Sequence, residues 1–294
     1  MQNAQPGIFA QGTRTHHHLE LHLRAGVADA VLRRALGSLR EPPVTAGGAN
    51  IVLGLGPDAA RRVFADRLPL GCNPFLPIEG PGRRAPATQH DVWVWIHGTG
   101  DDVVFDTARA VVRALEPCAR LVAERACFVY RDSRDLTGFI DGTENPPVEE
   151  APAVALIDDG PAAGSSHALV MRWVHDLDAF GALSVEEQEA VIGRTRPDSV
   201  ELDDKPPSAH ISRVVIEEDG EELEIYRRST PYGTVEEAGL LFVAFSADPA
   251  RFDRMLARMF GTSGDGLHDR LTDFSRPVSG ARYFVPALDL LAEL

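Results

Sequence analysis

The chain of 294 residues is 44% hydrophobic and 25% charged, the composition of a soluble globular protein with one large or two medium domains. Its formal net charge of −15 argues against nucleic acid and anionic membranes as partners, because both are negatively charged. Cysteines stand only at positions 72, 118 and 127, an odd number without CxxC spacing. Neither a zinc site nor a disulfide framework is therefore expected.

No apolar run approaches the roughly 18 residues that a transmembrane helix needs. The N-terminal run Met-Gln-Asn-Ala-Gln-Pro lacks the basic and apolar regions of a signal peptide. A reducing, cytoplasmic setting therefore fits the sequence best, and no membrane partner is predicted.

The first half of the chain alternates strand-like and helical segments. Residues 15–24 alternate apolar and polar side chains, as a half-buried strand does, and Pro57 suits the first turn of a helix. The predicted order is strand 15–24, helix 27–39, strand 50–56, helix 57–68, a Gly- and Pro-rich loop 71–88, strand 91–97, helix 103–115 and strand 123–130. This order is close to the β-α-β-β-α-β unit of ferredoxin-like folds.

Three consecutive histidines, His16, His17 and His18, open the first strand. Neighbouring strand residues point to opposite faces, so these side chains cannot converge on one metal ion. We predict a solvated start of the strand here rather than a metal site.

The pattern restarts after a connector at 149–164. Ser184 followed by Glu187 is the signature of a capping box, and Asp219-Gly220 that of a two-residue hairpin turn. The predicted order is strand 167–173, helix 178–190, strand 209–217, strand 223–228, strand 240–247, helix 249–260 and a short strand 282–285. We predict an α+β protein of two ferredoxin-like β-α-β-β-α-β halves, 1–146 and 147–294, packed as a dimeric α+β barrel. A single doubly wound α/β sheet is the alternative, but no GxGxxG or P-loop signature supports it.

The run Gly-Phe-Ile-Asp-Gly-Thr-Glu-Asn-Pro at 138–146 predicts a stiff loop near the middle of the chain. Gly138 and Gly142 allow positive φ or a close approach to a ligand, and Asn145 followed by two prolines marks a turn. Asp141 is thus held on a rigid loop beside apolar residues, as an acid/base carboxylate can be. The competing interpretation is a turn in which Asp141 only caps its own backbone.

The hairpin around Asp219 fixes which side chains face inward. A two-residue turn pairs position 218 with 221, which puts the apolar positions 214, 216, 223 and 225 on one face. Arg227 lies on that face, where an unpaired charge is costly, so it either meets an anionic partner or reaches out to water. His210 opens the first strand on the same face, and a neutral imidazole is a good iron ligand. Residue chemistry alone predicts a ligand or acid/base site from His210, Arg227 and Asp141.

Together these runs resemble the dye-decolorizing peroxidases, particularly their class B, cytoplasmic-type members. Residues 138–146 resemble the GxxDG signature of that family. Ser-Ala-His-Ile at 208–211 resembles the segment of its haem-ligating histidine, and Tyr-Arg-Arg-Ser-Thr-Pro-Tyr-Gly at 226–233 that of its distal arginine. Residues 192–195, 239–242 and 271–277 are also similar, so the resemblance covers most of the chain.

The resemblance implies that haem b is held mainly by the C-terminal half. His210 would bind the iron through Nε2, while its other ring nitrogen would donate to Asp273 and make the imidazole more electron-rich. Arg194 would pair with a haem propionate, since guanidinium and carboxylate match bidentately. The other residues assigned to the haem site are Arg227, Gly142, Thr143, Phe242 and Ser229, the last at a position where relatives often have Asn.

The implied activity is the reduction of hydrogen peroxide, with Asp141 or Arg227 handling the proton that passes between its two oxygens. A ferryl intermediate would then take single electrons from dyes, phenolics or other small-molecule donors. Electrons would reach a buried haem through aromatic side chains. The candidate relays are Trp93, Trp95, Trp173, Tyr226 and Tyr232, each of which ordinary strand packing would also explain.

Two other functions are compatible with the sequence. A protein of the same fold with another role, such as a chlorite dismutase or a haem- or iron-handling protein, predicts bound haem that is inert to peroxide. A haem-free ferredoxin-like binding module predicts no Soret band. A homo-oligomer is expected, but docking into an encapsulin shell is not, because residues 288–294 show no clear Gly-containing docking motif.

Overall fold

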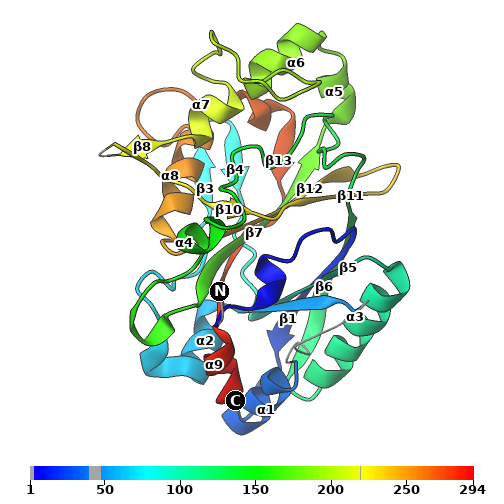
Figure 1. Cartoon of the computed structure of the whole chain (residues 1–294), viewed down its shortest axis with the longest axis vertical. Coiled ribbons are helices and arrows are strands. Elements are labelled where there is room, and N and C mark those ends of the chain that lie inside the picture. The colour runs from blue at the N-terminus through cyan, green and yellow to red at the C-terminus, as the bar shows by residue number, and fades with distance from the viewer. Residues whose placement is uncertain (1–2, 40–47, 219) are drawn as a thin grey trace.

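The computed structural model describes residues 3–39, 48–218 and 220–294, and both halves contribute strands to one sheet (Figure 1). In the first half the elements are β1 (Thr15–Leu23), α1 (Asp29–Gly37), β2 (Asn50–Leu55), α2 (Pro57–Phe64), β3 (Ile78–Gly80), β4 (Arg83–Ala85), β5 (Val92–Gly98), α3 (Asp101–Leu115) and β6 (Ala119–Phe128). In the second half they are α4 (Ala151–Ala155), β7 (Ser166–His175), α5 (Leu177–Gly181), α6 (Val185–Ile192), α7 (His210–Val214), β8 (Glu217–Glu218), β9 (Glu221–Glu222), β10 (Tyr226–Arg227), β11 (Thr230–Gly233), β12 (Ala238–Ser246), α8 (Ala250–Met259), β13 (Ser275–Pro277), β14 (Ala281–Val285) and α9 (Leu288–Ala292).

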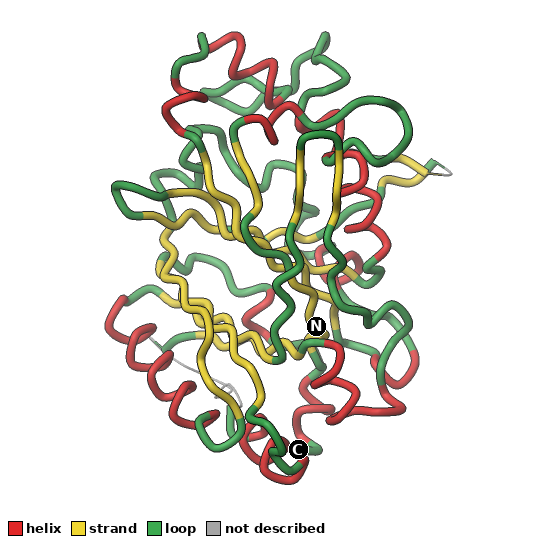
Figure 2. The backbone as a smooth tube through the Cα atoms, turned by 180° about the vertical axis from the view of Figure 1, so that it is seen from behind, coloured by secondary structure: helices red, strands yellow, loops and turns green. Residues whose placement is uncertain are grey.

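The main sheet is antiparallel and runs in the order β10-β12-β7-β14-β2-β5-β1-β6, with β11 beside β12 and β13 beside β7. The halves join where Phe284 of β14 pairs with Leu55 of β2. Figure 2 shows the strands in the middle of the molecule and helices outside them. The α+β class with two ferredoxin-like halves is confirmed. The doubly wound alternative is excluded, because that fold has a mostly parallel sheet and the observed pairings are antiparallel. Over the described ranges the order is an open path and does not close into a barrel ring.

β1 separates two cores. Leu19 and Leu21 face the apolar residues of α1 and α3, as the alternation of the strand predicts. On the opposite face, Trp93 and Trp95 of β5 pack between the halves against Tyr283 of β14. The core between the halves is therefore rich in aromatic side chains. His16 and His18 of β1 point toward it.

The three histidines of β1 are buried, so the prediction of a solvated strand start is wrong. His16, His17 and His18 are 3%, 8% and 3% exposed. Buried polar groups need partners, and indole N–H groups supply them, since Trp93 Nε1 donates to Nδ1 of His18 and Trp95 Nε1 to Nδ1 of His16. His17 points to the other face, so the rings do not converge.

The predicted strand 209–217 is wrong, because its first part forms the helix α7. Its backbone bonds are local, from Arg213 N to Ala209 O and from Val215 N to Ile211 O. The apolar positions 211, 214 and 215 have helical as well as strand-like spacing, and packing beside α8 (Figure 1) decides between the two. Contacts in the fold thus override the strand preference of the β-branched residues.

The hairpin that follows is shorter than predicted. Glu218 pairs with Glu221, as the register predicts, but Asp219 of the turn lies outside the described residues. Arg227 does not pair with Ser212. It lies in β10, opposite Ala244 of β12, because α7 has removed the strand that it was expected to join.

The helices of the second half are short. The predicted helix 178–190 is divided into α5 and α6, and the capping box of Ser184 and Glu187 at the start of α6 is confirmed. Among the residues that the structure describes, no helix is long and apolar enough to cross a membrane.

Candidate active site

A large cavity lies between β7 and β12 on one side and α7 and α8 on the other. Its empty volume is about 1420 Å³, with the open solvent at its mouth included. Much of its wall is apolar, including Leu169, Met171, Phe242, Phe252 and Met255. A spacious apolar pocket with convergent polar groups is the usual form of a ligand or active site.

His210, the first residue of α7, lines this cavity. Its Nδ1 lies 2.6 Å from Oδ2 of Asp269, a carboxylate that is 0% exposed. A carboxylate on one ring nitrogen fixes the orientation and tautomer of an imidazole and makes the other nitrogen more basic. Asp269 therefore leaves Nε2 of His210 as the nitrogen that can bind a ligand in the cavity.

The prediction that Asp273 is the partner of His210 is wrong. Asp269 caps the 3-10 turn η4 (Arg270–Asp273) through its Oδ1, so Asp273 lies at the far end of that turn. The Asp273 carboxylate forms an ion pair with Arg83 of β4 instead. The sequence offers two aspartates four positions apart, and only the fold shows which one faces His210.

Asp141 and Arg227 also line the cavity, and Asn145 fixes their positions. Gly138 and Gly142 have φ of +93° and +81°, the positive values that the sequence predicts for this loop. The Asn145 amide donates to Arg227 O and accepts from Arg227 N, both at 2.8 Å. This double hydrogen bond joins the loop of Asp141 to β10, so loop and strand form one wall of the cavity.

The electrostatics of Asp141 suit proton transfer. Burial raises the pKa of Asp141, the Arg227 guanidinium lowers it, and the charge of Asp135 raises it again. Across the described part of the chain, the Arg227 side chain makes no hydrogen bond or ion pair. A buried carboxylate with a raised pKa next to an uncommitted cation can exchange a proton with a ligand and stabilise negative charge on it.

A second histidine–carboxylate pair lies in the same wall. Asp135 Oδ1 lies 3.1 Å from Nε2 of His175, whose Nδ1 is 2.8 Å from Ser275 Oγ. Thr137 donates to the other carboxylate oxygen from its backbone N–H and its hydroxyl. Burial raises the pKa of Asp135, but the hydrogen bonds and charge of His175 and the Thr137 bonds outweigh it, so the net shift is downward. Asp135 is therefore a fixed negative charge near Asp141.

Arg194 lies in the cavity wall with Gly142, Thr143 and Phe242. Its Nη1 donates to Ser199 O at 2.6 Å, and it forms an ion pair with Glu144, another wall residue. Its Nη2 also lies 3.5 Å from Glu201 Oε2, and its Nε is buried without a hydrogen-bond partner among the residues that the structure describes. Arg194 thus presents a cation at the cavity whose hydrogen-bonding capacity is only partly used.

The structure does not place Ser229 in the cavity wall. Its Oγ accepts from Val243 N at 3.3 Å. Ser229 lines a neighbouring pocket, which meets the cavity at Asp141 and Arg227. The β10 strand ends at Arg227, so strand alternation does not carry Ser229 to the same face.

Two family models together match nearly all of this chain. The N-terminal model of the Dyp-type peroxidases matches residues 5–129, and the C-terminal model matches residues 132–290. The chain belongs to the Dyp-type peroxidase family. As a member it is a peroxidase, an oxidoreductase of the dye-decolorizing type.

Individual relatives agree with the family models. The dye-decolorizing peroxidase of Rhodococcus erythropolis is 40% identical over 267 residues, which are 88% of this chain and 77% of the relative. A DypB variant of Rhodococcus jostii RHA1 solved in complex with heme is 36% identical, with a TM-score of 0.92 over 97% of both chains. The encapsulated DyP-type peroxidase of Mycobacterium smegmatis is 34% identical, with a TM-score of 0.92 over 100% of this chain and 98% of that one.

Several residues of this Dyp-type peroxidase site were not predicted from the sequence. Asp269 stands four positions before Asp273, and no sequence signal distinguishes the two. The sequence predicts only a turn at Asn145, although an amide can hydrogen-bond a backbone as a strand partner does. Asp135 and His175 are 40 positions apart, and no spacing signal connects them.

Proposed function

We propose that this peroxidase is haem-dependent, that its cavity holds haem b, and that it uses hydrogen peroxide to oxidise dyes, phenolics or other small one-electron donors. The observation that carries the proposal is the His210–Asp269 pair, which offers Nε2 to an apolar cavity that also contains Asp141 and Arg227. The heme complex of the Rhodococcus jostii relative gives independent support.

The cavity residues fit a haem. The apolar wall suits the flat face of a macrocycle, and the imidazole of His210, backed by a carboxylate, suits its iron. Arg194 suits a propionate, because its guanidinium has a buried Nε without a partner and matches a carboxylate geometrically. When bound, haem would supply the metal at which peroxide reacts and electrons are exchanged.

The work that remains for the chain is to move one proton and to stabilise charge. Asp141, whose pKa is raised by burial, accepts a proton from one peroxide oxygen and returns it to the other as the O–O bond breaks. Arg227 stabilises the negative charge that develops on the departing oxygen. His210 holds its place through Asp269, and the apolar wall keeps bulk water away from the reacting atoms.

We propose that the enzyme is cytoplasmic and forms a homo-oligomer. Within each chain, we propose that the boundary between the two ferredoxin-like halves lies between residues 146 and 147. The acidic net charge of −15 supports a free, soluble catalyst of small molecules. Leu290 and Leu291 of α9 are 1% and 6% exposed and belong to the core, so these two side chains are not available to an encapsulin shell.

The haem proposal is tested by replacing the histidine that would bind the metal. We expect His210→Ala to lose the Soret band of the haem-loaded protein, because the pocket loses its iron ligand. His175→Gln is the matched control: His175 lines the same cavity, but both its ring nitrogens have protein partners. Full retention of the wild-type ferric spectrum by His210→Ala would rule out the ligand assignment.

A further inference from the structure

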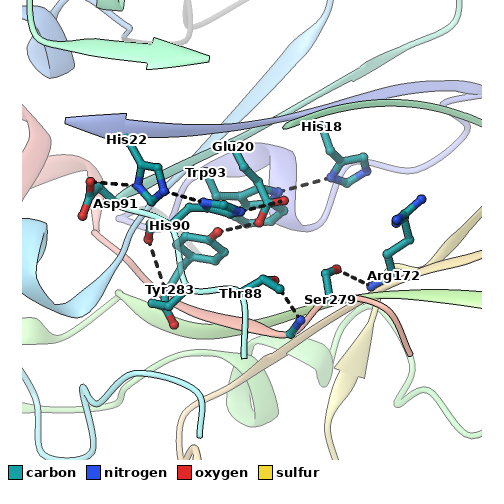
Figure 3. Close-up of polar contacts among 12 residues, drawn as sticks. His18, Glu20, His22, Thr88, His90, Asp91, Trp93, Arg172, Ser279 and Tyr283 are labelled. Atoms are coloured by element: carbon teal, nitrogen blue, oxygen red, sulfur yellow. Dashed lines mark hydrogen bonds and ion pairs between the residues drawn. The ribbon is translucent and has the colours of Figure 1, made fainter. Parts of the chain in front are cut away.

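A second polar cluster lies between the two halves, away from the cavity. It consists of Tyr283, Glu20, His90, His22 and Asp91, and we call it the tyrosine relay (Figure 3). The Tyr283 hydroxyl donates to Oε1 of Glu20 at 2.7 Å. Tyr283 is 1% exposed, and the Glu20 side chain is 16% exposed. The phenol thus shares a hydrogen bond with a carboxylate in a largely dry environment.

The relay continues from Glu20 to the surface. Oε2 of Glu20 lies 3.9 Å from Nε2 of His90, and Nδ1 of His90 lies 3.3 Å from Nε2 of His22. Nδ1 of His22 lies 3.2 Å from Asp91 Oδ2. The side chains of His22 and Asp91 are 36% and 33% exposed. The Glu20–His90 contact is too long for a direct hydrogen bond, so a proton on Glu20 reaches His90 only when the two side chains move closer. From His90 the hydrogen bonds continue to His22 and Asp91, whose side chains reach water.

Tyr283 and the cavity lie on opposite faces of the main sheet. Tyr283 of β14 pairs with Ala168 of β7, and the next residue of β7, Leu169, lines the cavity. Because neighbours along a strand point to opposite faces, one layer of sheet separates the phenol from the cavity. The Tyr283 ring also stacks on Trp93, with centroids 5.6 Å apart. An electron can cross this layer, whereas a substrate in the cavity cannot touch the phenol.

The carboxylate distinguishes Tyr283 from the other tyrosines of the chain. Tyr232 is equally buried, but its hydroxyl donates to the backbone carbonyl of Trp173. The Tyr226 hydroxyl accepts from Gln11, and no hydrogen bond is formed by the Tyr130 hydroxyl within the described residues. A neutral phenol must release its proton when it loses an electron. A carboxylate can take that proton, and a backbone carbonyl cannot.

We propose that Tyr283 is a one-electron donor to the cavity and that Glu20 accepts its proton. The inference rests on the proposed function, because the oxidising equivalents come from peroxide reduced at the cavity. One electron leaves the phenol for the oxidised cofactor, the O–H bond breaks, and the proton moves to Oε1 of Glu20, leaving a neutral tyrosyl radical. An external donor later returns one electron, and the proton returns from Glu20. Exchange of that proton with water runs through His90 and His22.

Burial supports this assignment in two ways. It raises the pKa of Tyr283, with the charge of Glu20 adding to the effect, so the phenol stays protonated and must give up its proton on oxidation. It also raises the pKa of Glu20, which makes this carboxylate a stronger base for that proton. The hydrogen bond of 2.7 Å provides the path.

The test uses haem-loaded protein, mixed with one equivalent of hydrogen peroxide, frozen within milliseconds and measured by electron paramagnetic resonance. We expect a tyrosyl signal in the wild type, its loss in Tyr283→Phe, and its retention in Tyr232→Phe, the matched buried control. Glu20→Gln keeps a hydrogen-bond acceptor but removes the base, so the signal should fall severalfold. Ring-deuterated tyrosine in the wild type should narrow the signal, which identifies it without any substitution.

The outcomes separate the inference from the proposed function. An undiminished signal in Tyr283→Phe, or wild-type protein that consumes peroxide without a tyrosyl signal, would overturn the role of Tyr283. An equal signal in Glu20→Gln would overturn the role of the carboxylate. Haem-loaded wild type that does not consume peroxide would overturn the proposed function itself, and with it the source of the oxidant.

Discussion

The carboxylates around this cavity differ in their hydrogen-bond partners, and this difference determines which of them can exchange a proton. Asp269 is fixed by His210 and by the turn that it caps, and Asp135 is fixed by His175 and Thr137. Among the described residues Asp141 has no comparable side-chain partner, so its ionisation depends on burial and on the charges around it. Residue types and spacing could predict Asp141, Arg227 and His210. They could not predict which carboxylate meets which imidazole, because that pairing depends on how distant segments pack.

Removing the charge of Asp135 should change the pH dependence of the peroxide reaction. The negative charge of Asp135 raises the pKa of Asp141, so Asp135→Asn should lower that pKa. In the proposed mechanism Asp141 works as a base when ionised, so the rate of the peroxide reaction should fall as pH drops through the pKa of Asp141. The acid limb of the pH–rate profile for peroxide should therefore move to lower pH in Asp135→Asn.

The control for that profile is Asp132→Asn. Asp132 carries the same charge in the same segment, but its side chain is 65% exposed and solvent screens it. Its profile should match that of the wild type. An acid limb that stays in place in Asp135→Asn, or that moves equally in both variants, would contradict the electrostatic role of Asp135.

At the scale of elements, α7 shows the limit of periodicity as a predictor. The order of the longer strands and helices in the first half and the capped start of α6 follow from local patterns. The prediction of a loop at 71–88 is wrong in part, because the short strands β3 and β4 pair there. The segment after Pro207 has a pattern that suits either a strand or a helix, and its packing beside α8 selects the helix. His210 is still at the start of the element and lines the cavity, although the element itself was predicted as a strand.

The two hydrogen bonds between Asn145 of the GxxDG loop and Arg227 of β10 should contribute both to the stability of the protein and to the rate of its reaction with peroxide. Asn145→Ala removes both hydrogen bonds to Arg227, which should lower the free energy of unfolding by about 1–3 kcal/mol. It should also slow the reaction with peroxide, because Asp141 and Arg227 lose their common anchor. Chemical denaturation and rapid mixing with peroxide measure the two effects.

Asn145→Asp keeps the oxygen that accepts from Arg227 N but turns the donor to Arg227 O into a second oxygen, which repels that carbonyl. It should therefore also be less stable than the wild type. If Asn145→Ala unfolds at the wild-type denaturant concentration, the two hydrogen bonds do not hold the loop.

On the scale of the whole molecule, the interior on both faces of the sheet contains histidines that are kept neutral. Burial lowers the pKa of His16 and of His167 to about 4 and depresses the pKa of His18 and His97 as well. No sequence pattern predicted this core, because periodicity gives the faces of each strand and not the partner that covers them. The sheet that joins β14 to β2 was unpredictable for the same reason.

These histidines should make the protein sensitive to mild acid. In the unfolded chain these histidines become protonated below their ordinary pKa of 6.5, whereas in the native state His16 and His167 stay neutral down to about pH 4. Stability should therefore fall as pH falls through this window, by about 1.4 kcal/mol per histidine for each pH unit. Denaturant unfolding from neutral pH down to about pH 5 measures the slope.

His16→Gln provides the comparison at equal haem loading, so that the contribution of the cofactor cancels. The free energy of unfolding of this variant should change less steeply with pH, by the contribution of one histidine, about 1.4 kcal/mol for each pH unit. A wild-type stability that is constant across the window would mean that these rings are protonated in the native state.

The position of β14 has a consequence for how the protein is made. β14 inserts between β7 and β2, yet it is the last strand to leave the ribosome. Until residue 285 has emerged, the facing edges of β7 and β2 have no neighbour, and open strand edges recruit other chains. The nascent polypeptide therefore carries an incomplete sheet through most of its synthesis. Premature termination between residues 275 and 281 would leave a product without β14 that is prone to aggregate, even though the segments of the cavity had already been translated.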